Sequence, residues 1–251
     1  MTVSLEVMKE QLNAAVVGAA PGGAADELCM ASVELFGVDG AAVSVIYDGQ
    51  SPGTFGSSSE TSRRLDEYQF TFGEGPCLDA VAAHEVVMVP DLDSPLERRW
   101  PAFAGAVLDE GVRGVFALPI MITSACVGAL DLFRARPGPL EGDQLAGAAL
   151  AARLASLSLI DLIAEGTSGQ SIASDDEDAW DLLADIDRIE VYQATGMVIS
   201  QLDVGPAEAL VRLRAHAIAT NQTARQVAVA ILARTLVLER DDHDGTGSSH
   251  P

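Results

Sequence analysis

Apolar residues recur at helical or strand spacing along most of the chain, so its elements can be predicted from the pattern alone. Residues 24–38 place leucine, valine and phenylalanine at helical intervals, which predicts a helix that ends at Gly37. Three β-rich runs follow, and the first of them, AAVSVIYD, is closed by a turn dipeptide, Asp-Gly. We therefore predict strands over residues 41–48, 53–59 and 86–90.

The middle of the chain adds a helix-like segment and a hairpin. Residues 95–112 have a helical pattern and carry Trp100. Two continuous apolar runs, 113–122 and 126–135, are separated by a short polar turn and predict two buried strands. A long Ala/Leu helix begins at Leu140. This order of helix, strands with helical insertions and closing helix predicts an α+β fold, an antiparallel sheet with flanking helices.

Changes in composition mark the expected domain boundaries. Residues 166–179, GTSGQSIASDDEDA, are small, polar and acidic, which predicts a linker between domains at 24–165 and 180–240. The polar ending, 241–251, is expected to be disordered. Residues 1–23 hold an Ala/Val run too short for a signal peptide or a membrane span. We expect them to form a helical extension of a cytoplasmic protein with no membrane contact.

Beyond the linker the pattern is purely helical. Apolar positions keep helical spacing up to Leu202, where the first helix is expected to end. Pro206 then stands where a first helical turn tolerates proline. Thr223 and Gln226 match a capping box ahead of a third apolar run. The C-terminal part is therefore predicted to be a small all-α domain of three helices.

Gly196 lies in the middle of the first of these helices, in YQATGMVI. A glycine there costs about 1 kcal/mol relative to alanine. Three short helices offer little core volume and must pack closely to bury enough surface. We therefore expect Gly196, flanked by Ala194 and opposite Ala207 and Ala209 of the next helix, to allow a close helix–helix contact.

Charge is distributed unevenly between the two parts. The whole chain has a formal charge of −22, of which residues 1–187 contribute −21 from nine basic and 30 acidic residues. Residues 188–240 hold six arginines against four acidic residues, a net charge of +2. This asymmetry indicates separate functions for the two parts.

The stretch FTFGEGPCLDAV, at 70–81, and the strand ALPIMI resemble a GAF domain, a small sensory module. The order of elements agrees over about residues 24–165. The resemblance implies a pocket for a small-molecule ligand between the sheet and the inserted helices. The side chains expected to line this pocket are Phe72, Cys77, Trp100, Phe116 and Phe133. For each of them, an ordinary place in the hydrophobic core is the alternative.

The segment RIEVYQATGMVISQLDVGPAEALVRLRAHAIATNQTARQVAVAIL resembles the ANTAR domain, a three-helix RNA-binding module that controls transcription termination in bacteria. Thr195 stands where the family usually has lysine, which removes one possible phosphate contact. The resemblance implies structural roles for four small residues, Ala194, Gly196, Ala209 and Ala217. The other matching positions are Ile189, Glu208, Leu213, Arg214, Asn221, Val227 and Ala228.

Arginines of this segment are the expected RNA contacts, because a planar guanidinium suits phosphates and stacked bases. Arg214 and Arg225 are predicted as the main contacts, with Arg188 and Arg212 secondary. For Arg212 an ordinary i,i+4 surface pair with Glu208 is the alternative. A net charge of +2 is small for such a module, so the domain alone should bind weakly. The resemblance implies that a dimer compensates by binding paired stem-loops. We expect a homodimer, because the helices over 140–165 and 178–202 have apolar stripes too broad for a lone surface helix.

No catalytic or metal-ligating set is predicted, and no cofactor is identified. Three cysteines spread along the chain fit reduced thiols better than disulfides, and the four histidines show no metal-ligand spacing. Cys77 follows Pro76 at an expected helix start, where the helix dipole lowers a thiol pKa, although Glu74 and Asp79 oppose this. It is either a buried, inert thiol or the reactive group of a redox sensor or reductase.

Together these features predict a signal-responsive regulator: a GAF-like sensor joined to an ANTAR-like module that binds RNA and causes transcription antitermination. Two other classes stay open. One is an enzyme on the GAF fold, of the free methionine sulfoxide reductase type. The other is a signal-relay scaffold whose helical end serves only to dimerise.

Overall fold

The computed structural model describes residues 3–19, 23–47, 50–167 and 189–239. The chain divides into two compact units, Met1–Ile189 and Glu190–Pro251. The predicted linker begins inside a helix that continues to Thr167, and its remaining residues lie outside the described ranges. The predicted disordered tail lies outside them too.

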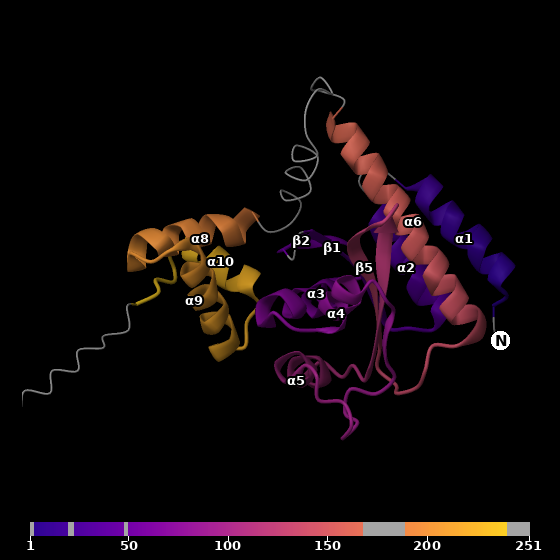
Figure 1. The fold of residues 1–251 in the computed structure, drawn as a ribbon, viewed down its shortest axis with the longest axis horizontal. Coiled ribbons are helices and arrows are strands. Elements are labelled where there is room, and N and C mark those ends of the chain that lie inside the picture. Colours follow the sequence, from indigo (N-terminus) through magenta and orange to yellow (C-terminus); the bar gives the residue numbers. More distant parts are fainter. Residues whose placement is uncertain (1–2, 20–22, 48–49, 168–188, 240–251) are drawn as a thin grey trace, which may run out of the picture. The chain divides into compact units, whose positions relative to one another are not determined.

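The first unit is built on a five-stranded antiparallel sheet with the strand order β2-β1-β5-β4-β3 (Figure 1). The strands are β1 (Gly40–Tyr47), β2 (Gln50–Ser57), β3 (Val87–Val89), β4 (Gly114–Ile122) and β5 (Ala125–Arg134). Successive side chains alternate between the two faces. In β1, Val43 and Val45 belong to the core on one face, while Ala42 lies in the core on the other. The predicted α+β architecture is confirmed.

Three helices cover one face of the sheet: α1 (Leu5–Gly18), α2 (Ala24–Phe36) and α6 (Gly142–Thr167). Figure 1 shows them together on one side of the strands. Their apolar faces meet in one large cluster, in which Met8, Leu28 and Phe36 are fully buried. The alanines of α6 at positions 148, 151 and 155 are also fully buried there, since small side chains let the long helix lie close to its neighbours.

The other face carries α3 (Glu60–Phe72), α4 (Pro76–Ala83) and α5 (Pro101–Asp109) (Figure 1). The sequence pattern did not predict α3. Its buried side includes the polar residues Asp66 and Gln69, so the helical periodicity of apolar residues is weak. Its start is nevertheless encoded locally, because the Ser59 hydroxyl accepts a hydrogen bond from the Ser62 N–H.

The second unit consists, in its described residues, of α8 (Ile189–Leu202), α9 (Pro206–Ala219) and α10 (Ala224–Leu232). Both hydrogen bonds of the predicted capping box at Thr223 and Gln226 are present. Three short helices were expected here, and the structure confirms them. Within the described ranges, no helix is long and apolar enough to cross a lipid bilayer.

Candidate functional site

The FGEGPC motif forms the turn between α3 and α4. Gly73 ends α3 in the left-handed conformation, with φ 69°. Gly75 precedes α4 with φ 151°, and a Cβ at this position would lie 2.7 Å from Cγ of Gln69. Only glycine fits such a backbone and such a contact. Pro76 then occupies the first turn of α4, so the motif fixes where Cys77 lies.

The two acidic residues near this turn have structural partners. Oε1 of Glu74 accepts hydrogen bonds from the N–H groups of Ala102 and Phe103, at 2.7 and 3.1 Å. These N–H groups belong to the first turn of α5, so Glu74 caps that helix. Oδ2 of Asp79 accepts a 3.1 Å hydrogen bond from the indole N–H of Trp100. The motif therefore ties α5 to the α3–α4 turn.

A buried polar cluster lies between the sheet, α3 and α4. Gln69 is at its centre: Nε2 donates to Oδ2 of Asp131 at 2.8 Å, and Oε1 accepts from the Cys77 N–H at 2.7 Å. Asp66 accepts hydrogen bonds from the hydroxyls of Ser44 and Thr54, the latter at 2.6 Å. Sequence reasoning missed this cluster, because its members come from five separate elements.

Cys77 adjoins this cluster with its thiol buried. It packs against Ile46 and Ala129 and is 1% exposed. Burial, followed by the charge of Asp131, raises the pKa of the Cys77 thiol well above its usual value. Burial therefore outweighs the helix-start effect considered from the sequence, and the thiol is protonated at neutral pH.

The five residues predicted to line one pocket lie in three different places. Trp100 and Phe133 are buried in the cluster under α3 and α5, and Phe72 packs against it. Cys77 belongs to the neighbouring cluster under α4. Phe116 is buried on the opposite face, among side chains of the α1, α2 and α6 layer. Its inclusion was wrong, because a continuous apolar run does not reveal which of its residues face which layer.

The second unit has a core of small and branched side chains. Ala194, Ala209 and Ala217 are fully buried, as their predicted structural roles require. Gly196 does not share this role. It is exposed, and a Cβ built there meets no described atom within 4 Å. The expected close contact at Gly196 is therefore wrong: the inner face of α8 carries Ala194 and Thr195 instead, and alanines supply the close packing.

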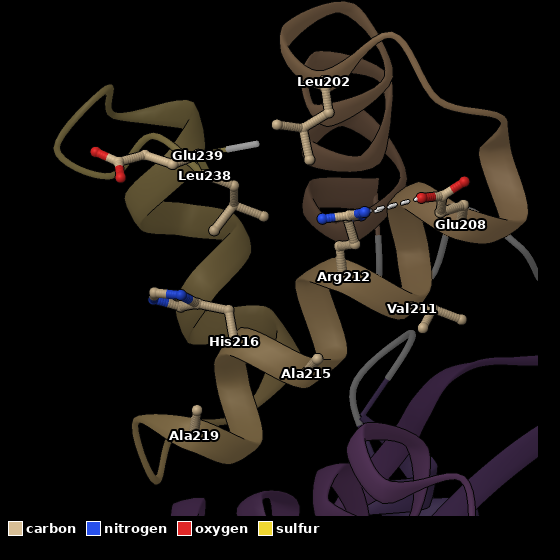
Figure 2. Close-up of a pocket in the computed structure, with 9 residues that line it drawn as sticks. All are labelled: Leu202, Glu208, Val211, Arg212, Ala215, His216, Ala219, Leu238 and Glu239. Carbon is tan, nitrogen blue, oxygen red and sulfur yellow. Dashed lines mark hydrogen bonds and ion pairs between the residues drawn. The ribbon is translucent and has the colours of Figure 1, made fainter. Parts of the chain in front are cut away.

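Arg212 lies in a hollow of about 510 Å³ on one side of α9 (Figure 2). Its Nε and Nη2 atoms both donate to Oε1 of Glu208 at 3.1 Å. Figure 2 shows this pair beside Leu202, with His216 and Leu238 further along the same hollow. The i,i+4 pair considered as the alternative for Arg212 is present, and such exposed pairs contribute about 0.3–0.5 kcal/mol.

Arg214 lies on a different side of α9. Two residues along a helix correspond to a rotation of about 200°, so the side chains of Arg212 and Arg214 leave α9 on nearly opposite sides and cannot both contact one flat surface. Arg214 and Arg225 are both half-buried, which leaves part of each side chain accessible. Arg188 lies outside the described residues. The structure thus places Arg212 and Arg214 on different sides of α9.

A family model of the GAF domain matches residues 23–159, and a model of the ANTAR domain matches residues 175–232. No curated protein matches the chain.

Several solved structures are similar to the first unit. The GAF domain of a phosphoenolpyruvate-protein phosphotransferase from Coxiella burnetii has a TM-score of 0.52 at 15% identity, covering 65% of this chain and 97% of that chain. The GAF domain of the Acinetobacter phosphoenolpyruvate-protein phosphotransferase has a TM-score of 0.48 at 13% identity. The match covers 65% of this chain and 94% of that chain. A type II free methionine-R-sulfoxide reductase from Thermoplasma acidophilum has a TM-score of 0.37 at 14% identity. The match covers 61% of this chain and 93% of that chain. At 15% identity, the likeness to the Coxiella burnetii domain shows the fold alone and does not extend to an activity.

Proposed function

Because the chain belongs to the GAF domain family and carries an ANTAR domain after it, we propose that it is a signal-responsive transcription antiterminator. In this proposal the ANTAR domain binds paired stem-loops in a nascent transcript in the cytoplasm. The GAF domain binds a small molecule and gates the RNA-binding output. The domain pair itself supports a regulator with an RNA-binding output.

The observation that carries this proposal is the ANTAR match over residues 175–232. Residues 188–240 have a net charge of +2, while residues 1–187 have −21. Phosphate contacts need cationic side chains, and Arg214 and Arg225 supply them from α9 and α10. We assign the main RNA contacts to these two residues, with Arg212 and Arg188 secondary.

Dimerisation would offset the modest charge of one module. On α6, Leu157 and Ile160 are 52% and 41% exposed, and on α2 Met30 is 42% exposed. Their i,i+3 spacing puts Leu157 and Ile160 on one side of α6, where pairing with a second copy would bury them. Two linked modules bind two adjacent stem-loops with a higher effective concentration and without any new contact.

The GAF–ANTAR architecture suggests a regulator rather than an enzyme. A reductase of the methionine sulfoxide type needs a reactive thiolate, whereas the buried Cys77 thiol has a raised pKa. The polar residues around it serve as caps and hydrogen-bond partners of the fold. These features favour the regulator over the enzyme for the first unit.

Binding of three RNAs by the full chain tests the proposed function. The probes are an RNA with two adjacent stem-loops, an RNA with one of them, and a plain duplex of the same length. We expect the two-loop RNA to bind most tightly and the duplex most weakly, since unpaired loops expose the bases. In a transcription assay, the protein should increase read-through of a terminator that overlaps the loops. Equal affinity for all three RNAs, or unchanged read-through, would contradict the proposal.

A further inference from the structure

Three metal-ligating side chains converge inside the first unit. Asp66 comes from α3, Cys77 from α4 and Asp131 from β5. Their ligand atoms, two carboxylate oxygens and one sulfur, all lie within 4.8 Å of one another. All three residues are buried, at 2%, 1% and 0% exposed.

Both carboxylates are held by hydrogen bonds from side chains other than these three possible ligands. Ser44 and Thr54 orient Asp66, while Gln69 holds Oδ2 of Asp131. Gln69 is fixed in turn by the Cys77 N–H. Outer-shell donors that fix the orientation of ligating groups are a regular feature of metal sites in proteins.

One oxygen of this cluster has no partner among the described residues. Oδ1 of Asp131 is fully buried and receives no hydrogen bond. An unpaired buried carboxylate oxygen costs about 1–3 kcal/mol or more, so its presence needs an explanation. A bound cation would remove both the unpaired oxygen and the repulsion between the two acids.

We propose that Asp66, Cys77 and Asp131 form a binding site for a divalent transition-metal ion, Zn²⁺ or Fe²⁺. The thiolate favours these ions over Mg²⁺ and Ca²⁺, which prefer oxygen ligands alone. Three protein ligands leave a coordination position for water or a small molecule. On binding, the Cys77 S–H bond breaks, its proton passes to solvent, and a sulfur–metal bond forms. The ion would tie α3 and α4 to the sheet.

Cobalt binding tests this site, because Co²⁺ takes the same ligands and a thiolate–cobalt bond absorbs in the near ultraviolet. The full chain is stripped with a chelator and given Co²⁺ in two ways, added to the folded protein or present during refolding. We expect this absorption band at one equivalent of Co²⁺, with release of protons. The band should vanish in Cys77→Ser and persist in Cys29→Ser, a matched variant of a buried cysteine in the other layer.

Two milder variants separate metal binding from folding. Thr54→Val keeps side-chain shape but removes a donor to Asp66, and Asp131→Asn removes a charged ligand. Both should keep the circular-dichroism spectrum of the wild type and weaken Co²⁺ binding about 10–100-fold. Absence of the band under both loading conditions, its persistence in Cys77→Ser, or wild-type affinity in both milder variants would overturn the proposal. These readouts need no RNA, so they are independent of the proposed function.

Discussion

The side-chain carbonyl of Gln69 accepts a 2.7 Å hydrogen bond from the Cys77 N–H, and its amide donates to Asp131 at 2.8 Å. One side chain of α3 therefore links the start of α4 to the centre of β5. Gln69 is 2% exposed, so water cannot replace either bond.

Gln69→Leu should destabilise the first unit, because it leaves two buried polar groups without partners. Each such group costs about 1–3 kcal/mol. Urea unfolding followed by circular dichroism measures this loss. The exposed Gln11→Leu serves as the control and should lie within about 0.5 kcal/mol of wild type. Equal stability of the two variants would show that the Gln69 bonds do not hold the unit together.

Alkylation should distinguish the cysteines of the folded protein, measured with a chelator present. The pKa of Cys77 is raised well above its usual value, so the unreactive thiol predominates at neutral pH and its thiolate forms only at strongly alkaline pH. We expect Cys77 and the buried Cys29 to react with iodoacetamide only after unfolding, and the half-buried Cys126 to react first.

Cys77→Ser should bind RNA as the wild type does. If peroxide changed RNA binding in the wild type alone, the domain would be a redox sensor.

Gly196→Ala should stabilise the second unit. The position is exposed and has open space for a Cβ, so only the helix propensity changes, by about 1 kcal/mol in favour of alanine. Thermal unfolding monitored by the helical signal measures the effect. A loss of helicity in Gly196→Ala would contradict this prediction and would support the close helix–helix contact that the sequence suggested.

Charged substitutions on α6 should dissociate the proposed homodimer. Leu157→Glu with Ile160→Glu places two carboxylates on the exposed apolar stripe of that helix. Light scattering at micromolar concentration should give a dimer mass for the wild type and a monomer mass for the double variant. Leu96→Glu, at a residue 95% exposed outside the helices, should remain dimeric. A monomeric wild type, with or without RNA, would rule out this assembly.

The sequence predicted most elements where local patterns were strong. The hairpin of β4 and β5 followed from two apolar runs, and the start of α10 followed from its capping box. Helix α3 was missed because Asp66 and Gln69 interrupt its buried face. The sequence also did not show that Gly196 lies on the exposed side of α8, since helical spacing alone does not reveal which side of a helix meets its neighbours.

The candidate sites depended even more on tertiary structure. Phe116 and Phe133 both lie in continuous apolar runs, yet the strand register sends them to opposite faces. The Asp66, Cys77 and Asp131 cluster joins residues up to 65 positions apart, which no local motif connects. The RNA-binding segment was easier to identify, because its three helices are consecutive in the sequence.

The most direct measurement is the RNA affinity of the full chain and of Arg214→Ala/Arg225→Ala, on a two-stem-loop RNA over a range of salt. Arg212→Ala, at a secondary contact that lies on another side of α9 and pairs with Glu208, should weaken binding less than the double variant does. We predict that the double variant binds at least about tenfold more weakly, with its helical signal intact. The slope of log affinity against log salt should become shallower by roughly 0.7–0.9 for each lost phosphate contact. Unchanged affinity and slope in the double variant, or no RNA binding by the wild type, would contradict the assignment.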